Sequence, residues 1–115
     1  MSDQNGIPDL ATLTRKVQEL NRVIRRMEER LMEEGTEAAD AEAAYRAQYA
    51  HHLRQQREQG TTVAEAEAYA RAAVVVLSQD RDVKAHRVKV TFEEIQDRRD
   101  ERVSLHRLMD AIGGS

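Results

Sequence analysis

Apolar residues near the start of the chain recur at alternating intervals of three and four residues. They are Leu10, Leu13, Val17, Leu20, Ile24, Met27 and Leu31. On an α-helix this spacing places all seven side chains on one narrow face, which is typical of a coiled-coil seam. Because a single helix cannot shield such a seam from water, the segment requires a partner helix.

A second apolar row follows in the C-terminal half, interrupted by Arg98, Arg99 and Arg102. It consists of Val88, Phe92, Ile95, Leu105, Leu108, Met109 and Ile112. Between the two rows, Gly60 suits the left-handed residue that ends a helix, and Thr62 with Glu65 has the spacing of a capping box. The pattern predicts an antiparallel hairpin in which the two rows form one seam.

Residues that break or end helices set the predicted boundaries of one helical-hairpin domain over residues 9–112. Gly35 and Thr36 predict a break or kink at 35–36, between a helix at 9–34 and a helix at 37–59. A turn follows at 60–62, and the absence of Pro and Gly then permits one long helix over 63–112. Residues 1–8 and 113–115 are expected to be tails.

A hairpin that turns near Gly60 brings together residues whose numbers sum to about 121. This register places Glu34, Glu37 and Asp40 near Arg87, Lys84 and Arg81, in that order. Exposed ion pairs contribute about 0–1 kcal/mol each, so they select the register more than they stabilise the fold. The alternative is that residues 9–34 pair in parallel with copies of themselves, because both arrangements use the same seam.

The composition predicts a thin core. The chain has 115 residues, of which 40% are hydrophobic, but it contains one Phe, three Tyr and no Trp. One hairpin of two helices leaves much of each helix surface in water, so we expect a homo-oligomer that forms a helical bundle. The predicted fold class is all-α, an elongated antiparallel helical hairpin of coiled-coil type.

Candidate chemistry is sparse, and the sequence predicts no catalytic, cofactor-binding or metal-binding residue. There is no Cys, and the adjacent His51 and His52 diverge by about 100° on a helix, so they cannot grip one metal ion together. Acidic and basic residues number 21 and 18, so no basic lobe favours nucleic acid. We expect a protein that is not an enzyme, needs no cofactor and does not bind a membrane.

The predicted hairpin tip has a distinct composition and is the candidate contact surface. Its members are Tyr45, Tyr49, His52, Arg54, Arg57 and Arg71. In the favoured interpretation the Tyr rings pack over small residues of the returning chain, namely Ala66, Ala70 and Ala73. In the other interpretation the rings and cations bind single-stranded nucleic acid or an acidic partner, with a protein partner favoured over nucleic acid.

Three stretches resemble a group of small helical-hairpin proteins encoded by tailed phages. They are Ala44-Tyr45-Arg46-Ala47-Gln48-Tyr49, the segment from Gly60 to Glu67, and Val103-Ser104-Leu105-His106-Arg107-Leu108-Met109. The likeness covers residues 40–112 and supplies no catalytic residues. It implies a setting among phage replication and recombination genes. We expect an accessory binding or scaffold protein that works beside phage DNA replication or recombination proteins in the host cytoplasm, with a phage or host protein as partner.

Two other functional classes fit the same sequence. One is a virion structural protein or assembly chaperone, which would be associated with the phage particle. The other is a small inhibitor of a host defence enzyme or nuclease that uses acidic helix faces to mimic nucleic acid.

Overall fold

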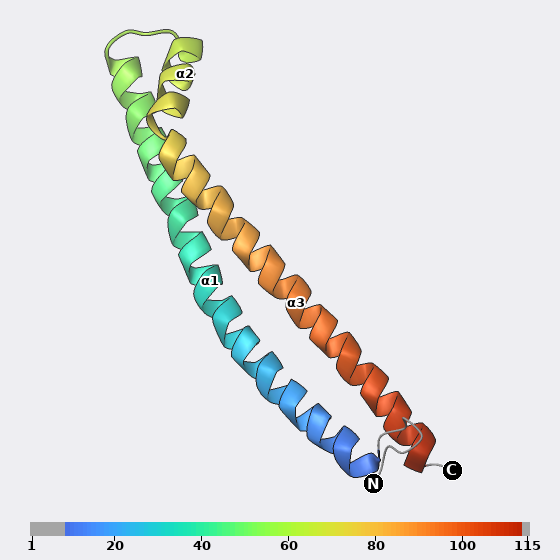
Figure 1. Cartoon of the computed structure of the whole chain (residues 1–115). Coiled ribbons are helices and arrows are strands. Elements are labelled where there is room, and N and C mark those ends of the chain that lie inside the picture. The colour runs from blue at the N-terminus through green and yellow to red at the C-terminus, as the bar shows by residue number, and fades with distance from the viewer. Residues whose placement is uncertain (1–8, 114–115) are drawn as a thin grey trace. The chain divides into compact units, whose positions relative to one another are not determined.

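The computed structural model describes residues 9–113, and these residues form three α-helices and no strand. Helix α1 spans Leu10–Glu58, α2 spans Val63–Ala73 and α3 spans Val75–Gly113 (Figure 1). This confirms the all-α helical hairpin. The tails predicted at 1–8 and 114–115 lie outside the described residues, whereas Gly113 is the last residue of α3.

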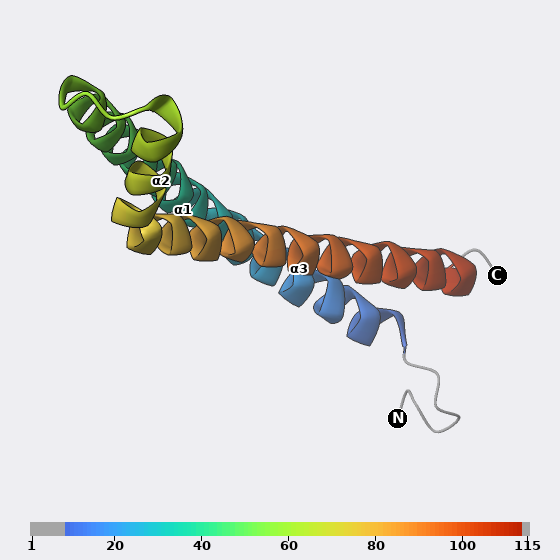
Figure 2. The ribbon, with the colours of Figure 1, turned by 90° about the horizontal axis from the view of Figure 1, so that it is seen from above.

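The chain divides into two compact units. Unit 1 combines the residues up to Leu31 with those from Val90 onward, and unit 2 contains Met32–Lys89. In unit 1 the first part of α1 pairs with the second part of α3. In unit 2 the second part of α1 pairs with α2 and the beginning of α3 (Figure 2).

Helix α1 is continuous through the break that the sequence predicted at 35–36. Asp9 caps its N-terminus, because the Asp9 carboxylate accepts a hydrogen bond of 2.8 Å from the amide of Thr12. Thr36 does not cap a second helix, since its hydroxyl donates to the carbonyl of Met32 at 3.1 Å within the same helix. A single Gly costs a helix about 1 kcal/mol, which the Ala- and Glu-rich flanks of Gly35 outweigh.

The turn predicted around Gly60 is present and has a defined hydrogen-bonding pattern. Gly60 has a φ of 87°, and its amide donates to the carbonyl of Arg57 at 3.0 Å. The amide of Thr61 reaches the carbonyl of Gln56 at 3.3 Å, which completes a Schellman motif. The hydroxyl of Thr62 then accepts from the amide of Glu65 at 3.2 Å and starts α2.

The predicted single helix over 63–112 is interrupted at Val74, which has φ −110° and ψ 18°. The amide of Val74 still donates to the carbonyl of Ala70, and its carbonyl accepts from the amide of Ser78 at 2.8 Å. Val74 is buried in line with Ala66 and Ala70, each four residues apart. The three consecutive residues Val74, Val75 and Val76 are β-branched and have reduced helix propensity. Packing can therefore bend the chain here without Gly or Pro.

The N-terminal seam forms in unit 1 largely as predicted. Leu13, Val17 and Ile24 are buried, and Leu20, Met27 and Leu31 are half-buried. Leu10, in the first turn of α1, is exposed, which corrects its assignment to the seam. A helix end has fewer neighbouring turns to cover it.

The seam row of α3 differs from the predicted row at two positions. Phe92 is 51% exposed, and Thr91, at 3%, occupies the buried position instead. Leu108 is exposed, whereas the adjacent Met109 is half-buried. Both corrections follow from the three-four spacing, which runs through Val88, Thr91, Ile95, Arg98, Arg102, Leu105, Met109 and Ile112. The seam row of α3 is therefore continuous, but some of its positions hold polar side chains, which a search for apolar residues does not find.

The register of the hairpin is shifted from the predicted one. In unit 1, Arg30 pairs with Glu94 at 3.1 Å, Arg99 with Glu28 at 3.4 Å, and Arg102 donates to Asn21 at 2.9 Å. These partners have numbers that sum to 123–127 instead of 121. The same shift occurs in unit 2, where Arg81 contacts Glu42 instead of the predicted Asp40. Counting from Gly60 therefore gives the wrong pairs.

Candidate interaction surfaces

Two aromatic rings and one cation of unit 2 are neighbours. The rings of Tyr45 and Tyr49 are 6.1 Å apart at an interplanar angle of 24°. The guanidinium carbon of Arg81 lies 4.1 Å from the centre of the Tyr45 ring, a cation–π contact. Both Tyr side chains are half-buried, so the structure brings them together as a packing element.

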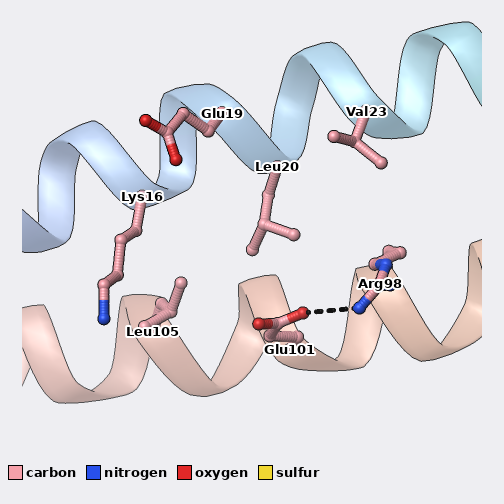
Figure 3. Close-up of a pocket in the computed structure, with 7 residues that line it drawn as sticks. All are labelled: Lys16, Glu19, Leu20, Val23, Arg98, Glu101 and Leu105. Atoms are coloured by element: carbon pink, nitrogen blue, oxygen red, sulfur yellow. Dashed lines mark hydrogen bonds and ion pairs between the residues drawn. The ribbon is translucent and has the colours of Figure 1, made fainter.

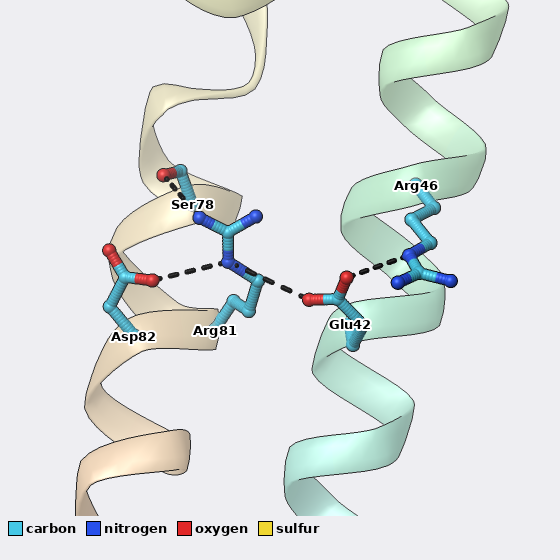
Figure 4. A network of polar contacts seen from close by, with 5 residues as sticks. All are labelled: Glu42, Arg46, Ser78, Arg81 and Asp82. Carbon is cyan, nitrogen blue, oxygen red and sulfur yellow. Dashed lines mark hydrogen bonds and ion pairs between the residues drawn. The ribbon is translucent and has the colours of Figure 1, made fainter.

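Arg81 is also the centre of a polar network that links α3 to α1 within unit 2 (Figure 4). Its Nε lies 3.7 Å from one carboxylate oxygen of Glu42 and 3.2 Å from Asp82, and Nη2 lies 3.5 Å from the Ser78 hydroxyl. The other oxygen of Glu42 accepts from Arg46 at 2.7 Å. Glu42 thus bridges one Arg of its own helix and one of α3.

The surroundings of Arg81 act on its pKa in opposite directions. Desolvation lowers it, whereas the hydrogen bond and charge of Asp82 and the charge of Glu42 raise it, and the net effect is a raised pKa of Arg81. The guanidinium therefore keeps its charge and holds the network together. The apolar pattern of the sequence did not identify Arg81 as a site residue. The sequence feature that could have identified Arg81 is the seam spacing, at intervals of three and four, through Val74, Leu77, Arg81, Lys84 and Val88.

His52 packs between two other rings of the tip. Its ring lies 5.4 Å from that of His51 in an edge-on arrangement and 6.1 Å from that of Tyr69. The Nδ1 atom of His52 is buried and has no hydrogen-bond partner among the described residues. Its two ring neighbours make His52 a packing residue of the α1–α2 contact, while Tyr69 keeps about half of its surface exposed.

The three predicted Arg contacts at the tip do different things. Arg57 donates from Nη1 to the carbonyl of Thr61 at 2.6 Å, so it fastens the turn. Arg71 lies in the last turn of α2, where a positive charge interacts favourably with the helix dipole. Arg54 lines a shallow hollow together with His51, Gln55 and Glu58. The six predicted tip residues therefore form no single converging site.

The packing prediction for small residues is correct for two of the three positions. Ala66 and Ala70 are fully buried, as expected of residues that allow a close approach of α2 to α1. Ala73 is exposed, because it lies beside the buried row of Ala66, Ala70 and Val74 instead of in it.

A groove of about 400 Å³ lies between α1 and α3 in unit 1 (Figure 3). Leu20 points into it from α1 and Leu105 points into it from α3, and Val23 extends its apolar floor. Charged residues surround the floor, and two of them, Arg98 and Glu101, form an ion pair of 3.3 Å. The groove marks the place where Arg98 occupies a seam position and leaves the apolar contact incomplete.

Large apolar side chains are exposed unevenly within unit 2. On α2 and the beginning of α3, the exposed large hydrophobic residues are Val63, Tyr69, Val75, Val76 and Val83. In the α1 part of the same unit, Met32 is the exposed large hydrophobic residue. We call the five residues of α2 and α3 the return face.

Comparison of the chain with protein-family models, with curated proteins and with solved structures returned no match. Within residues 9–113, no helix has the length and apolar character needed to cross a membrane. The same residues contain no cluster of three or more His, Cys, Asp or Glu side chains that could hold a metal ion.

Proposed function

We propose that this chain is a binding and scaffold protein without enzymatic activity, which presents helical surfaces to other proteins. In this proposal it is a phage accessory factor that works beside DNA replication or recombination proteins in the host cytoplasm. The phage setting rests on the resemblance of residues 40–112 to small helical-hairpin proteins of tailed phages. The binding function rests on the structure of unit 2.

The return face is the observation that supports this function. Its five residues are at least 49% exposed, and Val76 is 73% exposed. Val75 and Val76 are adjacent, and Val83 follows Val76 by two helical turns on the same side of α3. Neighbouring exposed apolar side chains of this kind favour a surface that binds another protein. The α3 side of the return face serves self-association in this proposal, and the α2 side, with Tyr69, serves a different phage or host protein.

Tyr69 is suited to such a contact because its ring is held in place. The His52 ring supports it from α1 at 6.1 Å, while about half of the Tyr69 surface stays exposed. A preoriented aromatic ring loses little conformational entropy on binding, and Tyr is enriched among residues that dominate binding energy.

The test is recovery of cross-linked partners from phage-infected cells with the full chain, in wild-type form and as Tyr69→Ala. The matched control is Val103→Ala, because Val103 is an apolar residue of α3 that is 46% exposed in unit 1. We expect a defined phage or host protein to be lost with Tyr69→Ala and retained with Val103→Ala. Equal recovery with both variants would contradict the proposed role of the tip. Stoichiometric presence in purified particles would favour the virion class instead.

A further inference from the structure

Helix α3 carries a second row of residues at coiled-coil spacing, separate from its seam. Val76 and Val83 are seven residues apart, and Gln79 and His86 follow each of them by three. All four side chains are exposed, with Val83 at 51%, whereas the seam residues of this part of α3 are buried or half-buried. A row of this spacing fits a partner helix laid along it.

Charged residues flank this row in an ordered way. Asp80 and Arg87 lie on one edge, and Asp82 and Lys89 on the other, each pair seven residues apart and each with the acid first. Within the chain, Asp80 pairs with Lys84 at 3.2 Å and Asp82 with Arg81 at 3.2 Å. Arg87 and Lys89 form no ion pair with any residue that the structure describes.

We infer that the occupant of this row is α3 of a second copy of the chain, laid antiparallel across a two-fold axis between Val83 and His86. In an isologous contact residue i of one copy faces residue j of the other, and j faces i. In the antiparallel arrangement the acid of each edge therefore meets the base of the same edge. Asp80 of one copy faces Arg87 of the other, and Asp82 faces Lys89. Both acids therefore face a base. A parallel alignment would pair Asp82 with Arg87 of the other copy but would place Asp80 beside Val75, so it would leave one acid without a base.

This dimer rests on the proposed function, which includes self-association. It specifies the surface of α3 that associates and the relative direction of the two helices. The apolar centre is small, with Val83 beside His86 of the other copy on each side of the axis. Interfaces of this size are weak, so we expect an equilibrium between monomer and dimer.

Sedimentation velocity of the purified full chain over a concentration series provides the first test. Val83→Lys should weaken the dimer at least about tenfold in dissociation constant, because it places a charge at the axis. The control Val103→Lys changes a similarly exposed Val of the same helix and should leave the constant unchanged. Helicity measured by circular dichroism should be equal in all three proteins, since both positions are exposed.

The direction is tested with cysteines, which the natural sequence lacks. Asp80→Cys and Arg87→Cys are prepared separately, mixed and oxidised, and the disulfide dimers are separated by mass. The antiparallel contact predicts mainly the mixed dimer of the two variants. A predominance of the two homodimers would overturn the antiparallel arrangement.

The two readouts separate this inference from the proposed function. A chain that dimerises equally well as Val83→Lys would overturn the α3 surface, and a wild-type chain that stays monomeric at all concentrations would overturn self-association itself. Neither result affects the recovery of a different protein through Tyr69, which is measured in cells and with other variants.

Discussion

Arg81 of α3 lies with its guanidinium carbon 4.1 Å from the centre of the Tyr45 ring of α1. The same guanidinium reaches the carboxylate of Glu42, one turn before Tyr45 in the sequence. A seam position that would hold Leu in a regular coiled coil thus holds a cation with both a ring and a carboxylate as partners. This relationship fixes the contact of α3 with α1 in unit 2.

We therefore expect Arg81→Ala to lower the stability of the protein by about twice as much as Arg46→Ala, or more. Both Arg residues contact Glu42, but the side chain of Arg46 is 77% exposed and has no ring beneath it, whereas that of Arg81 is 27% exposed. Urea denaturation followed by circular dichroism measures both variants. Equal effects would show that the Tyr45 contact contributes nothing.

Glycine substitutions test the continuity of α1. Gly35 is inside the helix, and a methyl group added there would meet no atom within 4 Å. Gly35→Ala should therefore stabilise the protein by about 0.5–1 kcal/mol, because Ala costs less conformational entropy in a helix. Gly60→Ala should destabilise it by about 1–2 kcal/mol, since Gly60 has a positive φ. If Gly35→Ala lowered the midpoint of unfolding, the helix would be broken at 35–36 after all.

The sequence predicted those features that local chemistry determines. Gly60 and Thr62 locate the turn because their roles as C-terminal glycine and N-cap depend only on the adjacent residues. The N-terminal seam was visible because six of its seven residues face the partner helix. The identity of the partner segment, α3, followed from the central position of the turn.

Features that depend on tertiary packing were not predictable in the same way. Val74, at the bend, is buried together with Ala70. No helix-breaking residue near Val74 predicts the bend. Thr91 and Arg81 occupy seam positions that a search for apolar residues passes over. The tip residues were correctly grouped as aromatic and cationic, but Arg57 turned out to fasten the turn through Thr61, which depends on the local path of the chain.

Ile24 tests the seam itself. It is 3% exposed, so Ile24→Asp removes a buried side chain and places a carboxylate in an apolar environment. We expect a loss of about 4 kcal/mol in unfolding free energy. Met32→Asp is the control on the same helix, because Met32 is exposed, and it should change the stability by less than about 0.5 kcal/mol. Thermal unfolding of the two variants gives the comparison, and similar melting temperatures would mean that the seam is misplaced.

The two Arg residues near the end of α1, Arg54 and Arg57, should differ in their contribution to stability. Arg57→Glu should cost about 1 kcal/mol, because it removes the hydrogen bond to the carbonyl of Thr61 and adds a negative charge at the C-terminus of the helix. Arg54→Glu changes an exposed residue of the hollow and should stay within about 0.5 kcal/mol. Chemical denaturation of both variants checks the difference. Identical curves would rule out a structural role for Arg57.

In unit 1 the heptad seam of α1 is covered by the returning helix α3 of the same chain, which leaves the outer faces of the two helices for association. Glu28 and Arg99, which form an ion pair of 3.4 Å in unit 1, are suitable sites for spin labels after replacement by Cys. The doubly labelled chain is mixed with an excess of unlabelled chain, and the distance between the labels is measured by pulsed electron paramagnetic resonance. We predict a short distance that is independent of the dilution. A short distance that disappears on dilution would show that the seam of α1 pairs between chains and not with α3 of the same chain.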